Sequence, residues 1–342
     1  MLDKTENSST ETEGAGFIAT SYLDQYLQPL KALLTNEDVN EVAINPNGTV
    51  FVEYGSQHHM VATQVELTEE TILQLGNTIA GETRNQLGKD HPIVSGRIMA
   101  WDSPLRVQVI IPPAIEHAVS VSIRRYWSKI LKPEEIKFVT GRQVDLEHER
   151  LRRHRMLNEL AREGKLESLM QQAIDQRLNI MISGGTSSGK TTMARALLAM
   201  TNQEERLVTI EDAQELHPPH RNQVALIADR RPGSERLPDK LLESSLRMRP
   251  DRLILGEIRG TEAYQFLEAI NTGHPGSITT IHADSPALAF DRLALMVMRA
   301  GMQLAHSEII QYAKKTIDLV IQVGRVNGKR GVLEIYLPSL SG

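Results

Sequence analysis

The chain has 342 residues, of which 40% are hydrophobic and 24% are charged, and its formal net charge is −5. This composition is typical of a globular protein with room for two domains, and it excludes binding of polyanions through overall charge. The chain has no cysteine, which excludes disulfides, thiolate metal sites and cysteine nucleophiles. No apolar run reaches the roughly 18–20 residues that cross a bilayer, and no signal peptide is evident. We therefore expect a cytoplasmic protein without a transmembrane segment.

The first half of the chain predicts a tail and a small α+β domain. Residues 1–16 are polar and rich in Ser and Thr, which is typical of a disordered tail. Thr68 is a suitable N-cap for a helix, and Asn45-Pro46-Asn47-Gly48 is a suitable turn for a hairpin. In chain order we expect a helix over 21–34, a hairpin over 42–53, a helix over 68–87, and strands over 105–111 and 118–126. Together they form an N-terminal α+β domain over residues 17–135.

Residues 136–166 predict a linker between two domains. The stretch from 141 to 165 is dense in Arg, Glu and His, with Leu and Met at helical spacing. Mixed charges of this kind usually form surface salt bridges, so we expect a solvated helix or a charged linker here.

The second half, residues 167–342, alternates short apolar strands with helical stretches, which predicts an α/β domain with a mainly parallel sheet. The strands expected to form it cover 178–182, 207–210, 252–255 and 277–281. Near the end, Asn327-Gly328 separates two further strand-like runs over 316–323 and 332–337, which predicts a terminal hairpin.

A phosphate-binding loop lies directly after the first strand of this domain. Residues 184–191 read Gly-Gly-Thr-Ser-Ser-Gly-Lys-Thr, a complete G-x-x-x-x-G-K-[ST] pattern between an apolar strand and a helix. The glycines let backbone N–H groups surround phosphate oxygens, Lys190 can reach the terminal phosphates, and the hydroxyl of Thr191 can bind Mg²⁺. The sequence therefore predicts a site for ATP and Mg²⁺.

Polar side chains follow three other predicted strands of the same sheet. Glu211 ends one strand, Glu257 ends the next, and His282 follows the last. In parallel sheets such strand ends meet at one edge, where ligand sites lie, so we expect these side chains beside the phosphate loop. Gly256 occupies the place where many phosphate-loop enzymes carry an Asp, and Arg259 is placed to pair with Glu257.

These motifs resemble those of the secretion ATPases of the RecA-like superfamily. Residues 246–260 resemble the Walker B region of that family, 271–283 its His box and 209–215 its Asp box. The four motifs occur in the family's order, and the similarity runs from about residue 20 to the C-terminus. Type II secretion ATPases carry a tetracysteine zinc module that this chain lacks, so the resemblance is to the type IV secretion traffic ATPases. Pilus-retraction motors are the nearest alternative.

The resemblance implies a role for each matching residue. The residues implied to bind phosphates and Mg²⁺ are Gly184, Gly185, Thr186, Ser187, Ser188, Gly189, Lys190, Thr191 and Thr192. Those implied in catalysis are Glu257 at the metal and the attacking water, Glu211 or Glu215 as base or metal-shell ligand, and His282 as sensor of the γ-phosphate. Arg106 and Arg124 are implied to reach the nucleotide from the N-terminal domain, with Arg125 as the alternative to Arg124.

The resemblance also implies an assembly and its partners. The family forms homohexameric rings whose N-terminal domains move as nucleotide turns over, and the charged linker is suited to such a hinge. Other type IV secretion ATPases, inner-membrane components, and a DNA or protein cargo would be the partners, with peripheral association at the inner membrane. An ATP-switched scaffold with little turnover and a nucleic-acid motor are alternative functions, the second disfavoured by the acidic net charge.

Overall fold

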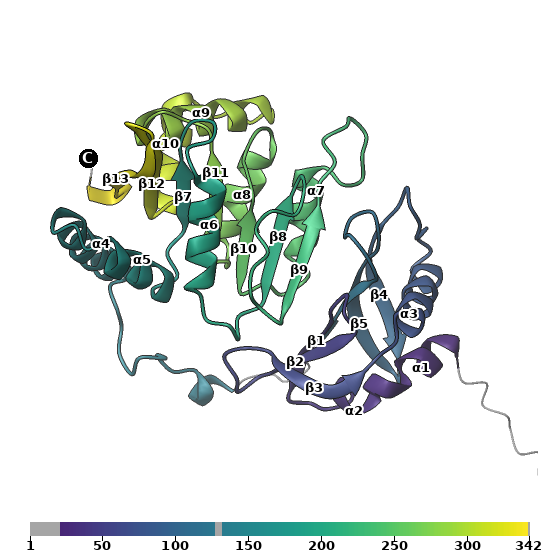
Figure 1. Cartoon of the computed structure of the whole chain (residues 1–342). Helices are drawn as coiled ribbons and strands as arrows, with labels where there is room; N and C mark the ends of the chain where they lie inside the picture. Colours follow the sequence, from purple (N-terminus) through teal and green to yellow (C-terminus); the bar gives the residue numbers. More distant parts are fainter. Residues whose placement is uncertain (1–20, 127–131, 341–342) are drawn as a thin grey trace, which may run out of the picture.

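The computed structural model describes residues 21–126 and 132–340, which build two sheets (Figure 1). The predicted tail, residues 1–16, lies outside the described residues. The predicted fold class is confirmed, because a mainly parallel sheet with helices on both faces follows a smaller α+β unit. Within the described residues no helix is both long and apolar enough to cross a membrane.

The N-terminal sheet has six antiparallel strands in the order β3-β2-β1-β6-β5-β4. Helices α1 and α3 pack together and bury their leucines and isoleucines against the sheet. The elements are α1 (Tyr22–Leu27), η1 (Gln28–Leu30), α2 (Lys31–Leu34), β1 (Val39–Ile44), β2 (Thr49–Tyr54), β3 (Val61–Glu66), α3 (Glu69–Glu82), β4 (Ile93–Ala100), β5 (Ser103–Ile110) and β6 (Ser120–Arg125).

Helix α3 begins where its cap predicts and ends before the predicted residue 87. The N–H of Thr71 donates to Thr68 Oγ1 at 3.2 Å, which confirms Thr68 as the N-cap. The helix stops at Glu82 because Arg84 adopts a left-handed backbone with φ of 55°. Strand β4 was not predicted, because Gly96 interrupts its apolar pattern; a Cβ at that position would collide with the side chain of Thr83.

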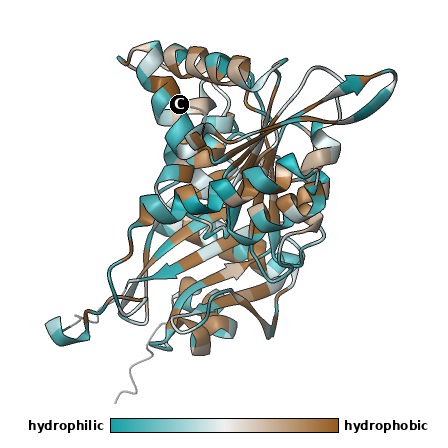
Figure 2. Cartoon of the chain, turned by 90° about the vertical axis from the view of Figure 1, so that its left-hand side faces the viewer, coloured by the Kyte–Doolittle hydropathy of each residue, from teal (hydrophilic) through white to brown (hydrophobic). Residues whose placement is uncertain are grey.

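The second sheet has seven strands in the order β13-β12-β7-β11-β10-β8-β9, all parallel except β13. Its strands are the hydrophobic interior of this half of the molecule, and the helices beside them turn hydrophilic faces outward (Figure 2). The elements are η2 (Pro133–Glu135), α4 (Leu146–Arg162), α5 (Leu166–Asp175), β7 (Ile180–Ser183), α6 (Lys190–Ala199), β8 (Leu207–Glu211), β9 (Gln223–Ile227), α7 (Pro238–Ser245), β10 (Arg252–Leu255), α8 (Glu262–Asn271), β11 (Ile278–Ile281), α9 (Pro286–Arg299), α10 (His306–Thr316), β12 (Leu319–Val326), β13 (Lys329–Tyr336) and η3 (Pro338–Leu340).

The charged stretch predicted as a solvated helix or linker contains α4, which is anchored to the second sheet. Leu157 of α4 is fully buried in the same apolar cluster as Ile180 and Leu198. Arg150 Nε donates to Asp318 Oδ1 at 3.0 Å, and His154 Nε2 lies 3.3 Å from the same oxygen. Residues 136–145 have neither helix nor strand. Because α4 packs on the second sheet, these residues are the part of the predicted linker that is not bound to that sheet through a helix. The domain boundaries at 136 and 166 stay a prediction.

A buried polar cluster joins the two sheets. Arg206, which is fully buried, donates from Nη1 to Asn45 Oδ1 at 2.7 Å and to Asn222 Oδ1, and from Nε to the carbonyl of Met248 at 2.8 Å. Asn45 also donates to Asn222, at 3.1 Å. Asn45 belongs to the turn between β1 and β2, whereas the other three residues belong to the second half of the chain. We name Asn45, Arg206 and Asn222 the interdomain clasp.

Glu41 lies beside the clasp and predicts a pH dependence of stability. It is 3% exposed and sits on β1 between Glu53 of β2 and Arg124 of β6. Burial raises the pKa of Glu41 to about 7 from 4.5, although Arg124 opposes the shift. The folded chain therefore holds this proton more tightly than the unfolded chain, and Glu41 lowers stability by about 3 kcal/mol as pH rises from about 4.5 to above 7.

We expect Glu41→Gln to raise the free energy of unfolding relative to wild type at pH 8 and to leave it nearly unchanged at pH 5. Urea unfolding at the two pH values measures the difference. Glu37→Gln, at an exposed position of the same domain, is the control and should give no pH-dependent difference. An equal effect of Glu41→Gln at both pH values would mean that Glu41 is ionised throughout this range.

Candidate active site

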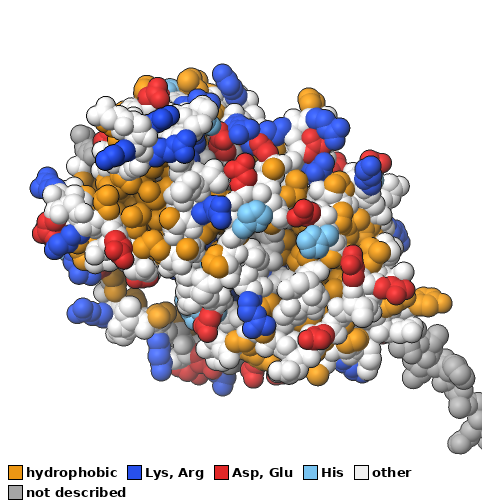
Figure 3. All heavy atoms as spheres, viewed as in Figure 1, with side chains coloured by type: hydrophobic (Ala, Val, Ile, Leu, Met, Phe, Trp, Pro, Cys, Tyr) orange, Lys and Arg blue, Asp and Glu red, His pale blue; other side chains and the backbone are white. Residues whose placement is uncertain are grey.

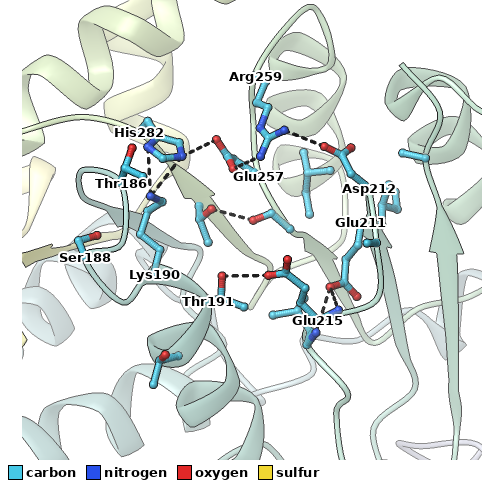
Figure 4. A pocket seen from close by; sticks show the side chains of 18 of the residues that line it. Thr186, Ser188, Lys190, Thr191, Glu211, Asp212, Glu215, Glu257, Arg259 and His282 are labelled. Atoms are coloured by element: carbon cyan, nitrogen blue, oxygen red, sulfur yellow. Dashed lines mark hydrogen bonds and ion pairs between the residues drawn. The ribbon is translucent and has the colours of Figure 1, made fainter. Parts of the chain in front are cut away.

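A pocket of about 510 Å³ lies at the edge of the sheet where β7, β8, β10 and β11 end. It brings together most of the predicted site (Figure 4). The predicted residues that line it are Thr186, Ser187, Ser188, Gly189, Lys190, Thr191, Thr192, Glu211, Glu215, Glu257 and His282. They come from four strand ends and one helix N-terminus, which is the convergence that the parallel sheet predicts.

The phosphate loop connects β7 to α6 with a conformation that only small residues allow. Gly189 has φ of 102°, and Ser187 has φ of 57°. Gly184 lies behind the pocket lining, where a Cβ would collide with Ser188 Oγ and the carbonyl of Val323. Ser188 Oγ is buried and has no hydrogen-bond partner within the described residues. A buried hydroxyl without a partner inside a glycine-bounded loop suits a ligand that accepts hydrogen bonds.

Lys190 carries a desolvated charge in this loop. It is 8% exposed, and Nζ donates to the carbonyls of Gly184 and Gly185 at 3.0 Å each. Burial lowers the pKa of Lys190, an effect that Glu257 opposes. Because its hydrogen-bond partners are neutral carbonyls, the ammonium is placed to gain from an anionic ligand.

The structure gives Glu211 and Glu215 different surroundings, which the sequence left open. Glu211 is buried and accepts hydrogen bonds from Thr209 Oγ1 at 3.2 Å and from the N–H groups of Glu215 at 2.9 Å and Leu216 at 3.0 Å. Its carboxylate thus holds the backbone of the loop that carries Glu215. Glu215 Oε2 instead accepts from Thr191 Oγ1 at 3.4 Å, at the start of α6.

Glu211 also explains the glycine that replaces the expected Asp. A Cβ on Gly256 would lie 3.1 Å from Glu211 Cγ and 3.3 Å from the carbonyl of Ile210. A longer side chain at this position would displace Glu211. Glycine at position 256 therefore leaves room for the side chain of Glu211 beside the end of β10.

Glu257 lies between a histidine and an arginine (Figure 4). Its Oε1 is 3.1 Å from His282 Nε2, and its Oε2 accepts from Arg259 Nη2 at 2.8 Å, which confirms the predicted pairing with Arg259. Partial burial is the largest single effect and raises the pKa of Glu257, but the hydrogen bond from Arg259 and the nearby charges of His282, Arg259 and Lys190 together outweigh it and leave the pKa below its ordinary value. Glu257 is therefore a carboxylate at neutral pH. His282 Nε2 donates a hydrogen bond to this carboxylate.

His282 is neutral in this arrangement. Burial lowers its pKa, Glu257 opposes this effect, and the charge of Lys190 adds to the lowering. Its Nδ1 lies 3.3 Å from Lys190 Nζ. The ring thus stands between Lys190 of the phosphate loop and Glu257.

Arg230 was not predicted as part of the charge network at the pocket, and Arg259 has a second carboxylate partner besides the predicted Glu257. Arg230 pairs with Asp212 at 2.9 Å and with Glu262 at 2.8 Å, and Arg259 also pairs with Asp212, at 2.9 Å. Arg230 follows β9, an edge strand whose alternating burial the sequence did not reveal. Both guanidinium groups therefore already have carboxylate partners within the described residues.

Arg106 and Arg124 are not brought to this pocket within one chain. They stand opposite each other on β5 and β6 and line a second hollow, of about 520 Å³, together with Arg177 and Arg249. That hollow lies before β10 and β11 begin, at the opposite edge of the sheet. Arg125 donates to the carbonyl of Val39 at 3.0 Å and to that of Asn36, so it serves its own domain.

The other polar residues considered in the sequence, His274 and the arginines after α7, contact groups of their own chain outside the pocket. His274 Nδ1 lies 3.1 Å from the carbonyl of Ala269, as expected of a loop residue. The basic run after α7 is paired throughout: Arg247 with Glu243, Arg249 with Glu53 and Asp251, and the fully buried Arg252 with Glu205.

Comparisons with known proteins show the family to which the chain is related. Residues 139–326 match the family model described as "Type II/IV secretion system protein". The VirB11 protein of the Bartonella henselae type IV secretion system is 33% identical over 329 residues, covering 91% of each chain. VirB11 of Brucella suis is 33% identical over 315 residues, covering 87% of this chain and 84% of that one. A crystal structure of the VirB11 ATPase from Brucella suis, in complex with sulphate, superposes with a TM-score of 0.81 at 32% identity, covering 93% of this chain and 96% of that one.

Proposed function

Because the chain belongs to the type II/IV secretion system family and is a VirB11 homologue over most of its length, we propose that it hydrolyses ATP for type IV secretion in the pocket that the phosphate loop lines. Membership makes it a P-loop ATPase. The observation that carries the choice of site is the ionised Glu257, held by Arg259 and His282 opposite Lys190.

The phosphate loop fits a nucleoside triphosphate with Mg²⁺. Residues 184–192 would hold the phosphates, with Lys190 and the unpartnered hydroxyl of Ser188 as donors. Thr191 Oγ1 would bind the metal, and Glu215, already 3.4 Å from that hydroxyl, would accept from its water shell. Mg²⁺ neutralises charge on the phosphate oxygens during transfer. The described residues form no cluster of three metal-binding side chains, which suits a metal that is held mostly by phosphates and water.

Glu257, Glu211 and His282 then take three different roles. Glu257, ionised and half-buried, orients the attacking water and accepts its proton, and it faces the metal through water. Glu211 holds the loop that carries Glu215 and contributes by positioning. His282, neutral between Lys190 and Glu257, responds to a γ-phosphate by exchanging one of these neighbours for a phosphate oxygen.

A homohexameric ring completes the proposal. Arg106 and Arg124 make no ion pair within the described residues and face away from their own chain's pocket, so they would reach a nucleotide only in a neighbouring copy. The ring would act at the inner membrane with other secretion components on DNA or protein cargo. Lys and Arg side chains are interspersed with Asp and Glu on the face seen in Figure 3, an arrangement that does not favour a nucleic-acid motor there.

Steady-state ATP turnover of the purified chain beside Lys190→Ala tests the site. Loss of a charge-assisted contact to phosphate should reduce turnover by about 10- to 100-fold. Lys240→Ala, which removes a half-exposed lysine paired only with Glu235, is the control and should turn over ATP like wild type. Equal turnover in Lys190→Ala would place catalysis elsewhere, and ATP binding without turnover in wild type would favour the ATP-switched scaffold.

A further inference from the structure

Arg330 lines the phosphate-loop pocket from outside every motif of the family. It lies on β13, and the match to the family model ends at residue 326. Neither the phosphate loop nor the Asp, Walker B or His motif includes it. Its presence in the pocket depends on the terminal hairpin folding back beside β7.

Among the Lys and Arg side chains that line this pocket in the described residues, Arg330 is the one that no other group of the protein holds. Of the four basic side chains that line the pocket in the described part of the chain, Arg230 and Arg259 are paired with carboxylates. Lys190 is held by two carbonyls and faces the reacting side. The side chain of Arg330 is exposed and makes no hydrogen bond or ion pair within the described residues.

The sheet places Arg330 on one flank of the phosphate loop and the catalytic candidates on the other. Strand β12 pairs with β7 on one side, with Gln322 opposite Ser183, and Arg330 of β13 is opposite Arg325 of β12. Strand β11 pairs with β7 on the other side and leads to His282. Strand β10, which leads to Glu257, is one position further. The reacting γ-phosphate belongs on the Glu257 side, so Arg330 faces the part of the nucleotide that does not react.

We propose that Arg330 binds the diphosphate portion that ATP and ADP share, as a positioning residue for the nucleotide. This inference rests on the proposed site. A guanidinium donates two parallel hydrogen bonds to phosphate oxygens, which fits an unpaired arginine at the rim of a phosphate cradle. A contact to the unreacting portion stabilises the ground state and the transition state equally, so it lowers KM and leaves kcat unchanged.

The experiment measures ADP and ATP affinity by equilibrium titration, together with kcat and KM, in wild type, Arg330→Ala, Arg330→Lys and Lys329→Ala. Arg330→Ala should weaken ADP and ATP binding alike, by about 10-fold, which is the lower range for a charge-assisted hydrogen bond. Its kcat should stay within about twofold of wild type. Arg330→Lys keeps the positive charge but loses the planar guanidinium that donates two parallel hydrogen bonds. It should therefore bind ADP and ATP more tightly than Arg330→Ala and more weakly than wild type.

Lys329→Ala is the matched control, because Lys329 is exposed, basic and adjacent in the hairpin but does not line the pocket. Unchanged ADP affinity in Arg330→Ala, or a weakening equal to that in Lys329→Ala, overturns the inference. A loss of kcat at unchanged affinity overturns it too, because that would put Arg330 at the reacting phosphate. Titrating ADP into Lys190→Ala as well distinguishes failure of this inference from failure of the proposed site. If the phosphate loop does not bind the nucleotide, Lys190→Ala and wild type should bind ADP equally well.

Discussion

Glu257→Gln is expected to bind ATP about as well as wild type and to turn it over roughly 10²- to 10⁴-fold more slowly, the range for removal of a general base. The amide keeps the shape of the side chain. Its oxygen can still accept from Arg259, which now donates at 2.8 Å. What disappears is the negative charge, and with it the ability to take a proton from water. ATP titration and single-turnover hydrolysis separate the two effects.

Glu243→Gln is the matched control for this prediction. Glu243 is an exposed carboxylate that also pairs with an arginine, Arg247, at 2.8 Å, but it lies outside the pocket. It should leave turnover unchanged. If Glu257→Gln hydrolyses ATP at the wild-type rate while Glu215→Gln does not, the base is Glu215 and the assignment drawn from the surroundings of Glu257 is wrong.

The sequence predicts this fold and pocket best where the signal is local. The phosphate loop, its strand and its helix are consecutive, so residues 178–199 could be read directly. Parallel strands carry their polar ends to one edge of the sheet, and for that reason the sequence predicts Glu211, Glu257 and His282 together. The secretion ATPase family indicated by the four motifs is likewise confirmed.

What the sequence missed depends on contacts between distant segments. Strand β9 is an edge strand with only alternate residues buried, and its carbonyl partner Ala114 lies in the other half of the chain. Arg330 enters the pocket because β12 pairs with β7, a register that no local pattern encodes. The resemblance implied that Arg106 and Arg124 reach the nucleotide, but within one chain the structure places them in a different hollow from the phosphate loop.

The interdomain clasp leads to the second large prediction: Arg206→Ala should lower the free energy of unfolding by roughly 3–5 kcal/mol, because it leaves a cavity at a fully buried position and takes a donor away from buried acceptors. Burial lowers the pKa of Arg206 to about 10, so the side chain is still charged at neutral pH. Without Arg206, the hydrogen bond from Asn45 to Asn222 can still form, but the buried carbonyl of Met248 loses the donor that Arg206 supplies. Urea unfolding monitored by circular dichroism measures the loss.

Asn45→Ala provides a milder variant in case Arg206→Ala does not fold, with an expected loss of about 1–3 kcal/mol. If the clasp acts as a unit, the double variant should lose less than the sum of the two single losses, because both changes remove the same contact. Arg247→Ala is the control, since its pair with Glu243 is largely exposed and should contribute less than about 1 kcal/mol. Equal losses in Arg206→Ala and Arg247→Ala would show that the clasp does not stabilise the chain.

The clasp also bears on how a ring of these chains would move. A swing of the N-terminal domain about residues 136–145 would have to break the contacts of Arg206 with Asn45 and expose a buried guanidinium. Losing a buried hydrogen bond to a charged group costs about 1.5–3 kcal/mol, after the hydration that the guanidinium regains is counted, and this is more than an exposed ion pair contributes. The N-terminal sheet should therefore move together with its own ATPase domain, and hydrogen exchange at β1 should be unchanged by ATP in wild type and faster in Arg206→Ala. Faster exchange at β1 on ATP binding in wild type would instead show that nucleotide opens the clasp.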